Sequence, residues 1–137
     1  MRRTRRSTAA FVTTVMLILT VMTVSAPAAS AALPSGCSIA VTVPSTDGVF
    51  VTSSTKITCS ASYALWARAA VDEKIGAVWN NVQGGWSTEA STSGTTVTAY
   101  KSFNCNGHGT DVWRGRGKGG TGTNTTETTS GSVSLTC

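Results

Sequence analysis

The chain has 137 residues, of which 40% are hydrophobic and 12% charged, enough for one small folded domain. Its formal net charge of +5 is concentrated at the N-terminus, where four of the 11 basic residues precede residue 7. The rest of the chain holds seven basic and six acidic residues, a balance of +1. That balance argues against a nucleic-acid-binding protein and against a basic membrane-active peptide.

The N-terminal segment has the layout of a secretory signal peptide. Four arginines among the first six residues precede the apolar run Phe11–Val24, and Ala29–Ala31 follows as a small-residue cleavage site. The apolar run is too short to span a bilayer. We therefore expect residues 1–31 to direct secretion and residues 32–137 to form one extracellular domain without a membrane span. Arg5-Arg6 leaves twin-arginine export open, but Sec export is favoured because no apolar residue stands two places after the pair.

Four cysteines indicate two structural disulfide bridges, because an exported chain meets an oxidising environment. They are Cys37, Cys59, Cys105 and Cys137. The chain has no Cys-x-x-Cys pair, and no cysteine pair stands at finger spacing from His108, so we expect no metal and no cofactor. Local hairpins favour the sequential pairing Cys37–Cys59 and Cys105–Cys137. An immunoglobulin-like pairing of Cys59 with Cys105, and of Cys37 with Cys137, stays open.

The beginning of the domain alternates in the pattern of β-strands. Cys37–Val43 places Ile39 and Val41 on one face. Pro44–Gly48 then predicts a turn, and Ile57–Tyr63 alternates apolar residues with serine and threonine. These two runs are expected to be strands with one buried face.

Residues 64–82 fit two structures. Their alanine, leucine, glutamate and lysine content favours a helix. A hairpin fits as well, because Ala67, Ala69 and Val71 alternate along one strand and residues 74–77 can turn. We favour the hairpin because the segments on both sides are predicted to be strands.

The second half of the domain continues with strands over Thr95–Phe103, Asp111–Arg116 and Ser132–Cys137. Asn104–Gly109 predicts a turn, and the glycine- and threonine-rich segment Gly115–Thr126 predicts a mobile connection. The fold class predicted from these elements is all-β: a small antiparallel β-sandwich, immunoglobulin-like or similar, with two disulfides.

Catalytic chemistry has little support in the sequence. His108 could act as a base oriented by Asp111, but no Gly-x-Ser-x-Gly elbow marks a serine nucleophile. Asp72 and Glu73 are adjacent and would point to opposite faces of a strand, so they would not pair across one sugar. We therefore expect His108 to be a solvated turn residue and the protein not to be an enzyme.

One segment has the character of a recognition site, because an aromatic ring and three cations stand between glycines. Its candidate contact residues are Trp113, Arg114, Arg116 and Lys118, with Trp86 as a possible neighbour. Indole and guanidinium groups can stack on a sugar ring or an aromatic partner, and the cations can meet carboxylate or phosphate. The competing interpretation has Trp113 filling the core while Arg114 and Arg116 face solvent.

This pattern favours a secreted, non-enzymatic binding protein whose partner is a polysaccharide, a cell-wall polymer or an extracellular protein. The alternative function is an extracellular hydrolase inhibitor that presents residues 113–120 as an exposed loop. Preorganised loops bind well, but the glycines of this segment weigh against rigidity.

The leader rich in arginine and alanine, together with Cys105-Asn106-Gly107, Trp113-Arg114 and the terminal Leu135-Thr136-Cys137, supports a resemblance. The chain resembles uncharacterised small secreted, disulfide-stapled proteins of high-GC Gram-positive bacteria. This resemblance implies no particular activity.

Overall fold

The computed structural model describes residues 32–137, and the predicted signal peptide lies outside the described residues. In chain order the strands are β1 (Cys37–Val41), β2 (Ser45–Thr46), β3 (Phe50–Ile75), β4 (Val78–Asn81), β5 (Ala90–Asn104), β6 (Thr110–Thr121) and β7 (Asn124–Thr136). The described part of the chain holds no helix long and apolar enough to cross a membrane.

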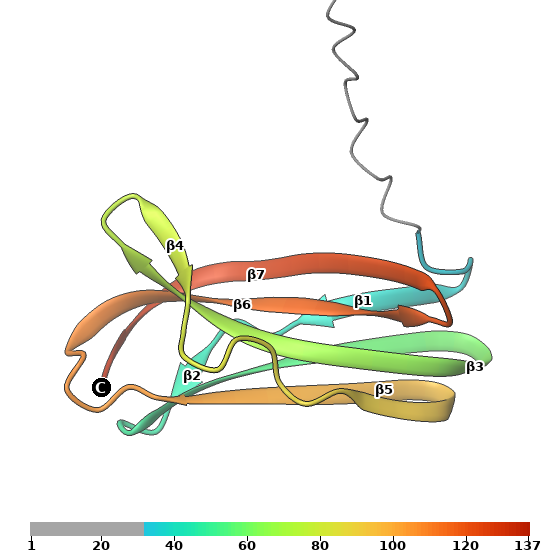
Figure 1. Ribbon diagram of the computed structural model, residues 1–137, viewed down its shortest axis with the longest axis horizontal. Helices are drawn as coiled ribbons and strands as arrows, with labels where there is room; N and C mark the ends of the chain where they lie inside the picture. Colours follow the sequence, from blue (N-terminus) through green and yellow to red (C-terminus); the bar gives the residue numbers. More distant parts are fainter. Residues whose placement is uncertain (1–31) are drawn as a thin grey trace, which may run out of the picture.

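All seven strands belong to one antiparallel sheet that is folded over on itself. β3 is its centre. β1, β2 and part of β5 pair with its first half, while β4, β6 and the rest of β5 pair with its second half. The register between β3 and β5 shifts between Thr58 and Tyr63, where β3 turns back at one end of the molecule (Figure 1). The result is the predicted all-β sandwich, whose two layers share β3 and β5.

The core lies between the two layers and takes alternate side chains from β3, as expected for a strand with one buried face. Ile57 and Leu65 stand on opposite sides of the bend in β3 and pack in the same apolar cluster. A second cluster contains Val51 and Val71, again one from each half of β3, together with Trp113 of β6. Trp113 has no exposed surface and is the largest fully buried side chain in the described residues.

The hairpin predicted for residues 64–82 is confirmed. β3 continues to Ile75, Gly76 makes the turn with a left-handed φ of 62°, and β4 returns from Val78. Ala67, Ala69 and Val71 are all buried, so the predicted alternation of this strand is also correct. The alanine-rich composition that suggested a helix serves instead to fill a thin space between the layers.

The sequential disulfide pairing is confirmed as well. Cys37 bonds to Cys59, its direct partner in the antiparallel pairing of β1 with β3. Cys105, just after β5, bonds to Cys137, just after β7. The second bridge ties the C-terminus to the turn that carries His108.

Residues 115–126 are not the mobile connection that their glycine content predicts. They form most of β6, a short turn and the start of β7, and β6 is hydrogen-bonded between β3 and β7. A Cβ atom added to Gly117 would lie 2.6 Å from Oγ1 of Thr55, and one added to Gly119 would lie 2.6 Å from Cδ1 of Ile57. Glycine at positions 115, 117 and 119 of β6 therefore lets the two layers approach closely.

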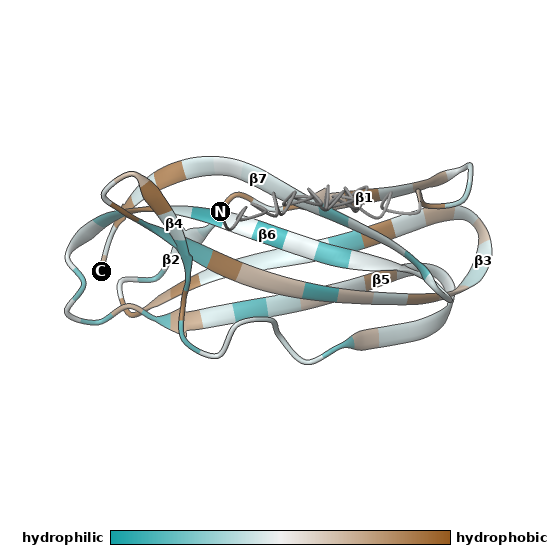
Figure 2. Ribbon diagram, turned by 45° about the horizontal axis from the view of Figure 1, so that its top comes forward, coloured by the Kyte–Doolittle hydropathy of each residue, from teal (hydrophilic) through white to brown (hydrophobic). Residues whose placement is uncertain are grey.

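The positions between these glycines carry Arg116 and Lys118, and the β6 ribbon alternates between hydrophilic and pale segments (Figure 2). Residues 113–120 are part of an interior strand of the sheet, so they do not form the exposed loop that the inhibitor hypothesis expects of them.

Candidate functional site

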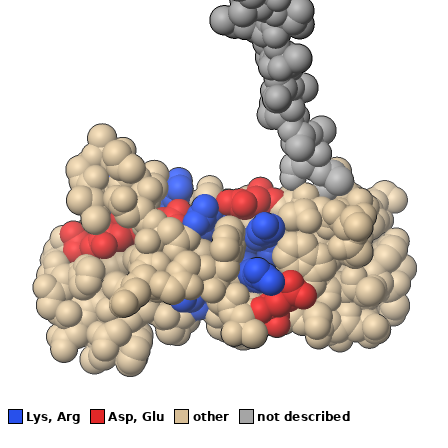
Figure 3. Space-filling view, viewed as in Figure 1, with Lys and Arg blue, Asp and Glu red and all other residues tan. Residues whose placement is uncertain are grey.

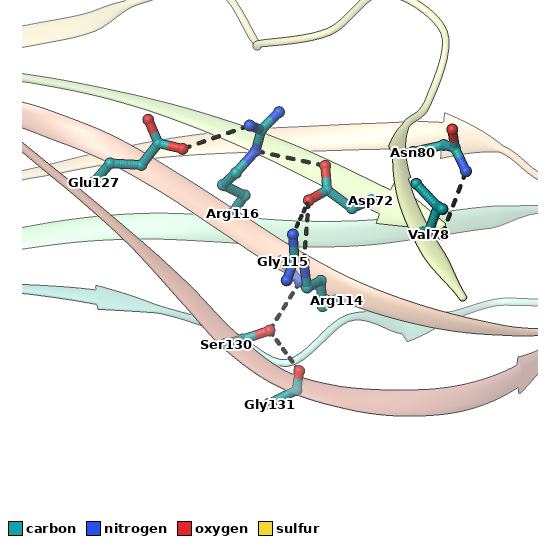
Figure 4. A network of polar contacts seen from close by, with 9 residues as sticks. All are labelled: Asp72, Val78, Asn80, Arg114, Gly115, Arg116, Glu127, Ser130 and Gly131. Atoms are coloured by element: carbon teal, nitrogen blue, oxygen red, sulfur yellow. Dashed lines mark hydrogen bonds and ion pairs between the residues drawn. The ribbon is translucent and has the colours of Figure 1, made fainter. Parts of the chain in front are cut away.

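The candidate site is built on the outer face of β3 and β6, around the carboxylate of Asp72. The register pairs Asp72 with Arg114 and Ala70 with Arg116, so both arginines lie beside the aspartate. Nε of Arg114 donates to Oδ2 of Asp72 at 3.1 Å, and Nη2 of the same guanidinium lies 3.1 Å from that oxygen as an ion pair. Nε of Arg116 lies 3.5 Å from Oδ1 of the same carboxylate, and its Nη1 donates to Oε1 of Glu127 at 3.5 Å (Figure 4). Asp72 thus fixes the guanidinium of Arg114 by a hydrogen bond and lies within ion-pair distance of that of Arg116, whose Nε has no hydrogen-bond partner among the described residues.

Two tryptophans cover these guanidinium groups. Cζ of Arg114 lies 4.4 Å from the ring centroid of Trp79, and Cζ of Arg116 lies 4.7 Å from that of Trp86. Both distances are within the range of cation–π attraction. Both indoles are half-buried, so part of each ring remains open to solvent. We call the surface formed by Asp72, Trp79, Trp86, Arg114 and Arg116 the arginine–tryptophan face.

Backbone contacts hold the segment that carries the two tryptophans. Trp79 lies on β4 opposite Lys74, whose Nζ is 5.9 Å from the same indole ring. Trp86 lies in the connection from β4 to β5, where the backbone N–H of Val82 donates to the carbonyl of Val71 at 3.2 Å. The N–H of Ser87 donates to the carbonyl of Ala69 at 2.7 Å. This connection therefore lies over β3 and covers Ala70 and Asp72, which are buried although they point away from the core.

Cations outnumber carboxylates around this face. Lys118 lies on the same side of β6, with Arg68 and Glu127 as its register partners on β3 and β7. Arg68 also pairs with Glu89 at 3.2 Å. With Lys74, this gives five cations against three carboxylates. Figure 3 shows basic side chains across the middle of the molecule with acidic ones beside them.

The structure separates the predicted contact residues into two groups. Arg114, Arg116, Lys118 and Trp86 lie on the outer face, as the strand interpretation requires. Trp113 does not. Its side chain is completely buried, so the prediction that it contacts a partner is wrong, and the competing interpretation of a core tryptophan holds. The reason is the strand period of two, which sends Trp113 inward when Arg114 and Arg116 point outward.

Sequence reasoning missed Trp79 and Asp72 as parts of the site. The hairpin alone could have indicated that Trp79 belongs to the site. A turn at Gly76 places Trp79 opposite Lys74, and β3 then separates it from the strand that carries Arg114. The role of Asp72 follows only from the pairing of β3 with β6, and no local sequence pattern predicts that pairing.

A second polar cluster lies at the end of the sandwich that carries the Cys105–Cys137 bridge. Nδ1 of His108 lies 3.0 Å from Oε1 of Glu73, and Asp111 stands close to both. Asp72 and Glu73 therefore have separate partners on opposite faces of β3, as predicted. His108 was expected to be a solvated turn residue. It is exposed in the turn between β5 and β6, and it is also paired with an acid.

Comparison of the chain with protein-family models, with curated proteins and with solved structures finds no match in any of the three. The assignment of a function therefore depends on the geometry of the residues described above.

Proposed function

We propose that the protein is a secreted, non-enzymatic binding protein that attaches to an extracellular polysaccharide or cell-wall polymer through the arginine–tryptophan face. The observation that carries this proposal is the stacking of two half-exposed indoles on two guanidinium groups that share one buried carboxylate. Tryptophan and arginine are the residue types that contribute most often to binding energy at interfaces.

The rigidity of the face supports this function. Arg114 and Arg116 stand on a strand that is paired on both sides. The guanidinium of Arg114 donates to Asp72, and that of Arg116 lies within ion-pair distance of Asp72 and Glu127. Side chains that are already ordered lose little conformational entropy on binding. The face can therefore present flat apolar rings and charged donors in a fixed arrangement, which suits a repeating polymer of sugar rings with carboxylate or phosphate groups.

The two disulfides are consistent with an extracellular protein, since such bridges persist in oxidising compartments. The proposed route to that compartment is the signal peptide expected in residues 1–31.

Co-sedimentation of the purified, oxidised protein with insoluble peptidoglycan, chitin and cellulose tests the proposal. We expect retention on at least one polymer that weakens but persists at high salt, because ionic contacts are screened while ring stacking is not. Trp79→Ala and Trp86→Ala should each weaken binding by about five- to thirty-fold.

Tyr100→Ala is the matched control, because Tyr100 is a strongly exposed aromatic residue on β5 opposite Ser54, in the other layer. This variant should bind as the parent protein does. Equal losses in all three variants, or no retention on any polymer, would contradict the proposal and turn attention to protein partners.

A further inference from the structure

We infer that Glu73, His108 and Asp111 form a binding site for a divalent transition-metal ion such as Zn²⁺. The three residues come from different parts of the sandwich: β3, the turn between β5 and β6, and the start of β6. One ligand atom from each lies within 4.8 Å of those of the other two. This site is separate from the arginine–tryptophan face and does not depend on the function proposed for that face.

The charge of the cluster favours a cation. Two carboxylates stand together, and the Glu73 side chain is only 11% exposed. A nearly buried carboxylate needs a hydrogen bond or a countercharge to offset its lost hydration. His108 supplies one contact to Glu73 at 3.0 Å, and a metal ion would supply the countercharge to both acids.

The spacing is suited to first-row metals. Two ligand atoms that each bind Zn²⁺ at about 2.1 Å with a tetrahedral angle are about 3.4 Å apart, close to the separation of Nδ1 of His108 and Oε1 of Glu73. Asp111 is half-exposed, and its ligand atom lies within 4.8 Å of those of Glu73 and His108. One imidazole and two carboxylates are donors that zinc and its neighbours accept, and three protein ligands leave a position for water.

The surroundings orient the imidazole ring. His108 packs edge-on against Phe103, with ring centroids 5.3 Å apart, and its centroid lies 6.0 Å from that of Trp113. Its backbone N–H donates to the carbonyl of Cys105 at 2.9 Å, and Cys105 is fixed to Cys137 by the disulfide. A ligand held in this way is prepared for metal binding, because neighbouring contacts that fix a histidine ring strengthen its coordination.

The test uses the purified, oxidised protein without a histidine tag, so that His108 is the only histidine present. Its imidazole then gives one set of nitrogen–proton signals in a long-range NMR correlation spectrum. One equivalent of Zn²⁺ should shift that set, and Cu²⁺ should give an electron paramagnetic resonance signal coupled to a single imidazole nitrogen. Calorimetric titration with Zn²⁺ gives the affinity.

His108→Gln and Asp111→Asn are the informative variants, because both side chains are partly exposed and their loss spares the core. Each should weaken Zn²⁺ binding by at least about tenfold. Glu73→Gln should do the same, with unchanged NMR dispersion as evidence that it folds. Glu89→Gln, which changes an exposed acid whose partner is Arg68, should leave the affinity unchanged. Absence of an imidazole shift at millimolar Zn²⁺, or parent-like affinity in His108→Gln and Asp111→Asn, would overturn the inference.

Discussion

Asp72 of β3 and Arg114 of β6 are direct partners in neighbouring strands, and two nitrogens of the Arg114 guanidinium lie 3.1 Å from one Asp72 oxygen. The Asp72 side chain is 3% exposed, whereas that of Arg114 is 26% exposed. A carboxylate below the surface therefore positions a cation at the surface, and Trp79 lies over that cation. This arrangement links the stability of the fold to the geometry of the proposed contact surface.

Replacement of Asp72 by asparagine should destabilise the protein, because it leaves Arg114 and Arg116 without their shared countercharge. We expect a loss of about 2–3 kcal/mol in the free energy of unfolding, below the full penalty for a broken buried pair because the arginines reach solvent. Urea denaturation measures the change. Glu89→Gln breaks the exposed Arg68–Glu89 pair and should change stability by less than about 1 kcal/mol. Equal effects of the two variants would contradict the role given to Asp72.

Replacement of Gly117 by valine should also destabilise the protein. The new Cβ would lie 2.6 Å from Oγ1 of Thr55, so the two layers would have to separate. Overpacking of this kind costs about 1–3 kcal/mol, and urea denaturation checks it.

Gly131→Ala is the control for this change. Gly131 lies on β7, and the nearest atom to a Cβ there is Cγ2 of Val43 at 3.9 Å. Its stability should match that of the parent protein. A parent-like Gly117→Val variant would show that the glycines of β6 are not there for close layer packing.

Replacement of Trp113 by alanine should have the largest effect on stability, about 3–5 kcal/mol, because it empties a fully buried site. If this variant also loses polymer binding, the loss would result from unfolding and would not indicate a direct contact between Trp113 and the polymer. Thermal unfolding followed by circular dichroism measures the change. A small shift in midpoint, similar to that of Trp86→Ala, would contradict the burial of Trp113.

The turn before β3 makes the protein sensitive to acid at one carboxyl group. Hydrogen bonds from the backbone N–H groups of Phe50 and Val49 hold the pKa of Asp47 below its ordinary value of 3.8. Because the pKa of Asp47 is lower in the folded protein than in the unfolded chain, its ionised carboxylate stabilises the fold at a pH above the unfolded-state pKa. This stabilisation is lost as the pH falls through the folded-state pKa. An NMR titration of the Asp47 carboxyl carbon measures this pKa. A value above 3.8 would contradict the turn geometry.

Local patterns were enough to predict the fold class, since strand alternation and local hairpins depend on neighbouring residues. The turn at Gly76 and the pairing of Cys37 with Cys59 are examples. The glycines of β6 led to the wrong prediction of a mobile connection, because glycine is depleted in β-strands. The strand is explained by residues distant in the sequence, which pack against Gly115 and Gly117 and leave no room for a larger side chain.

The sites were predicted only in part for the same reason. The outward positions of Arg114 and Arg116 follow from the period of a strand, and so does the burial of Trp113. Their partners do not. Asp72 and Trp79 reach Arg114 only after β3, β4 and β6 have paired, and Glu73 reaches His108 only across the sandwich.

The most direct test of the proposed binding face follows the indole N–H signals of the four tryptophans in an NMR spectrum while soluble peptidoglycan or chitin fragments are added. The signals of Trp79 and Trp86 should shift together in a saturable manner, and that of the buried Trp113 should stay in place. Trp66 is not part of the arginine–tryptophan face; it lines an open hollow with Leu65 and Glu89 and should also stay in place. Shifts confined to Trp66, or no shift at any tryptophan, would contradict the account.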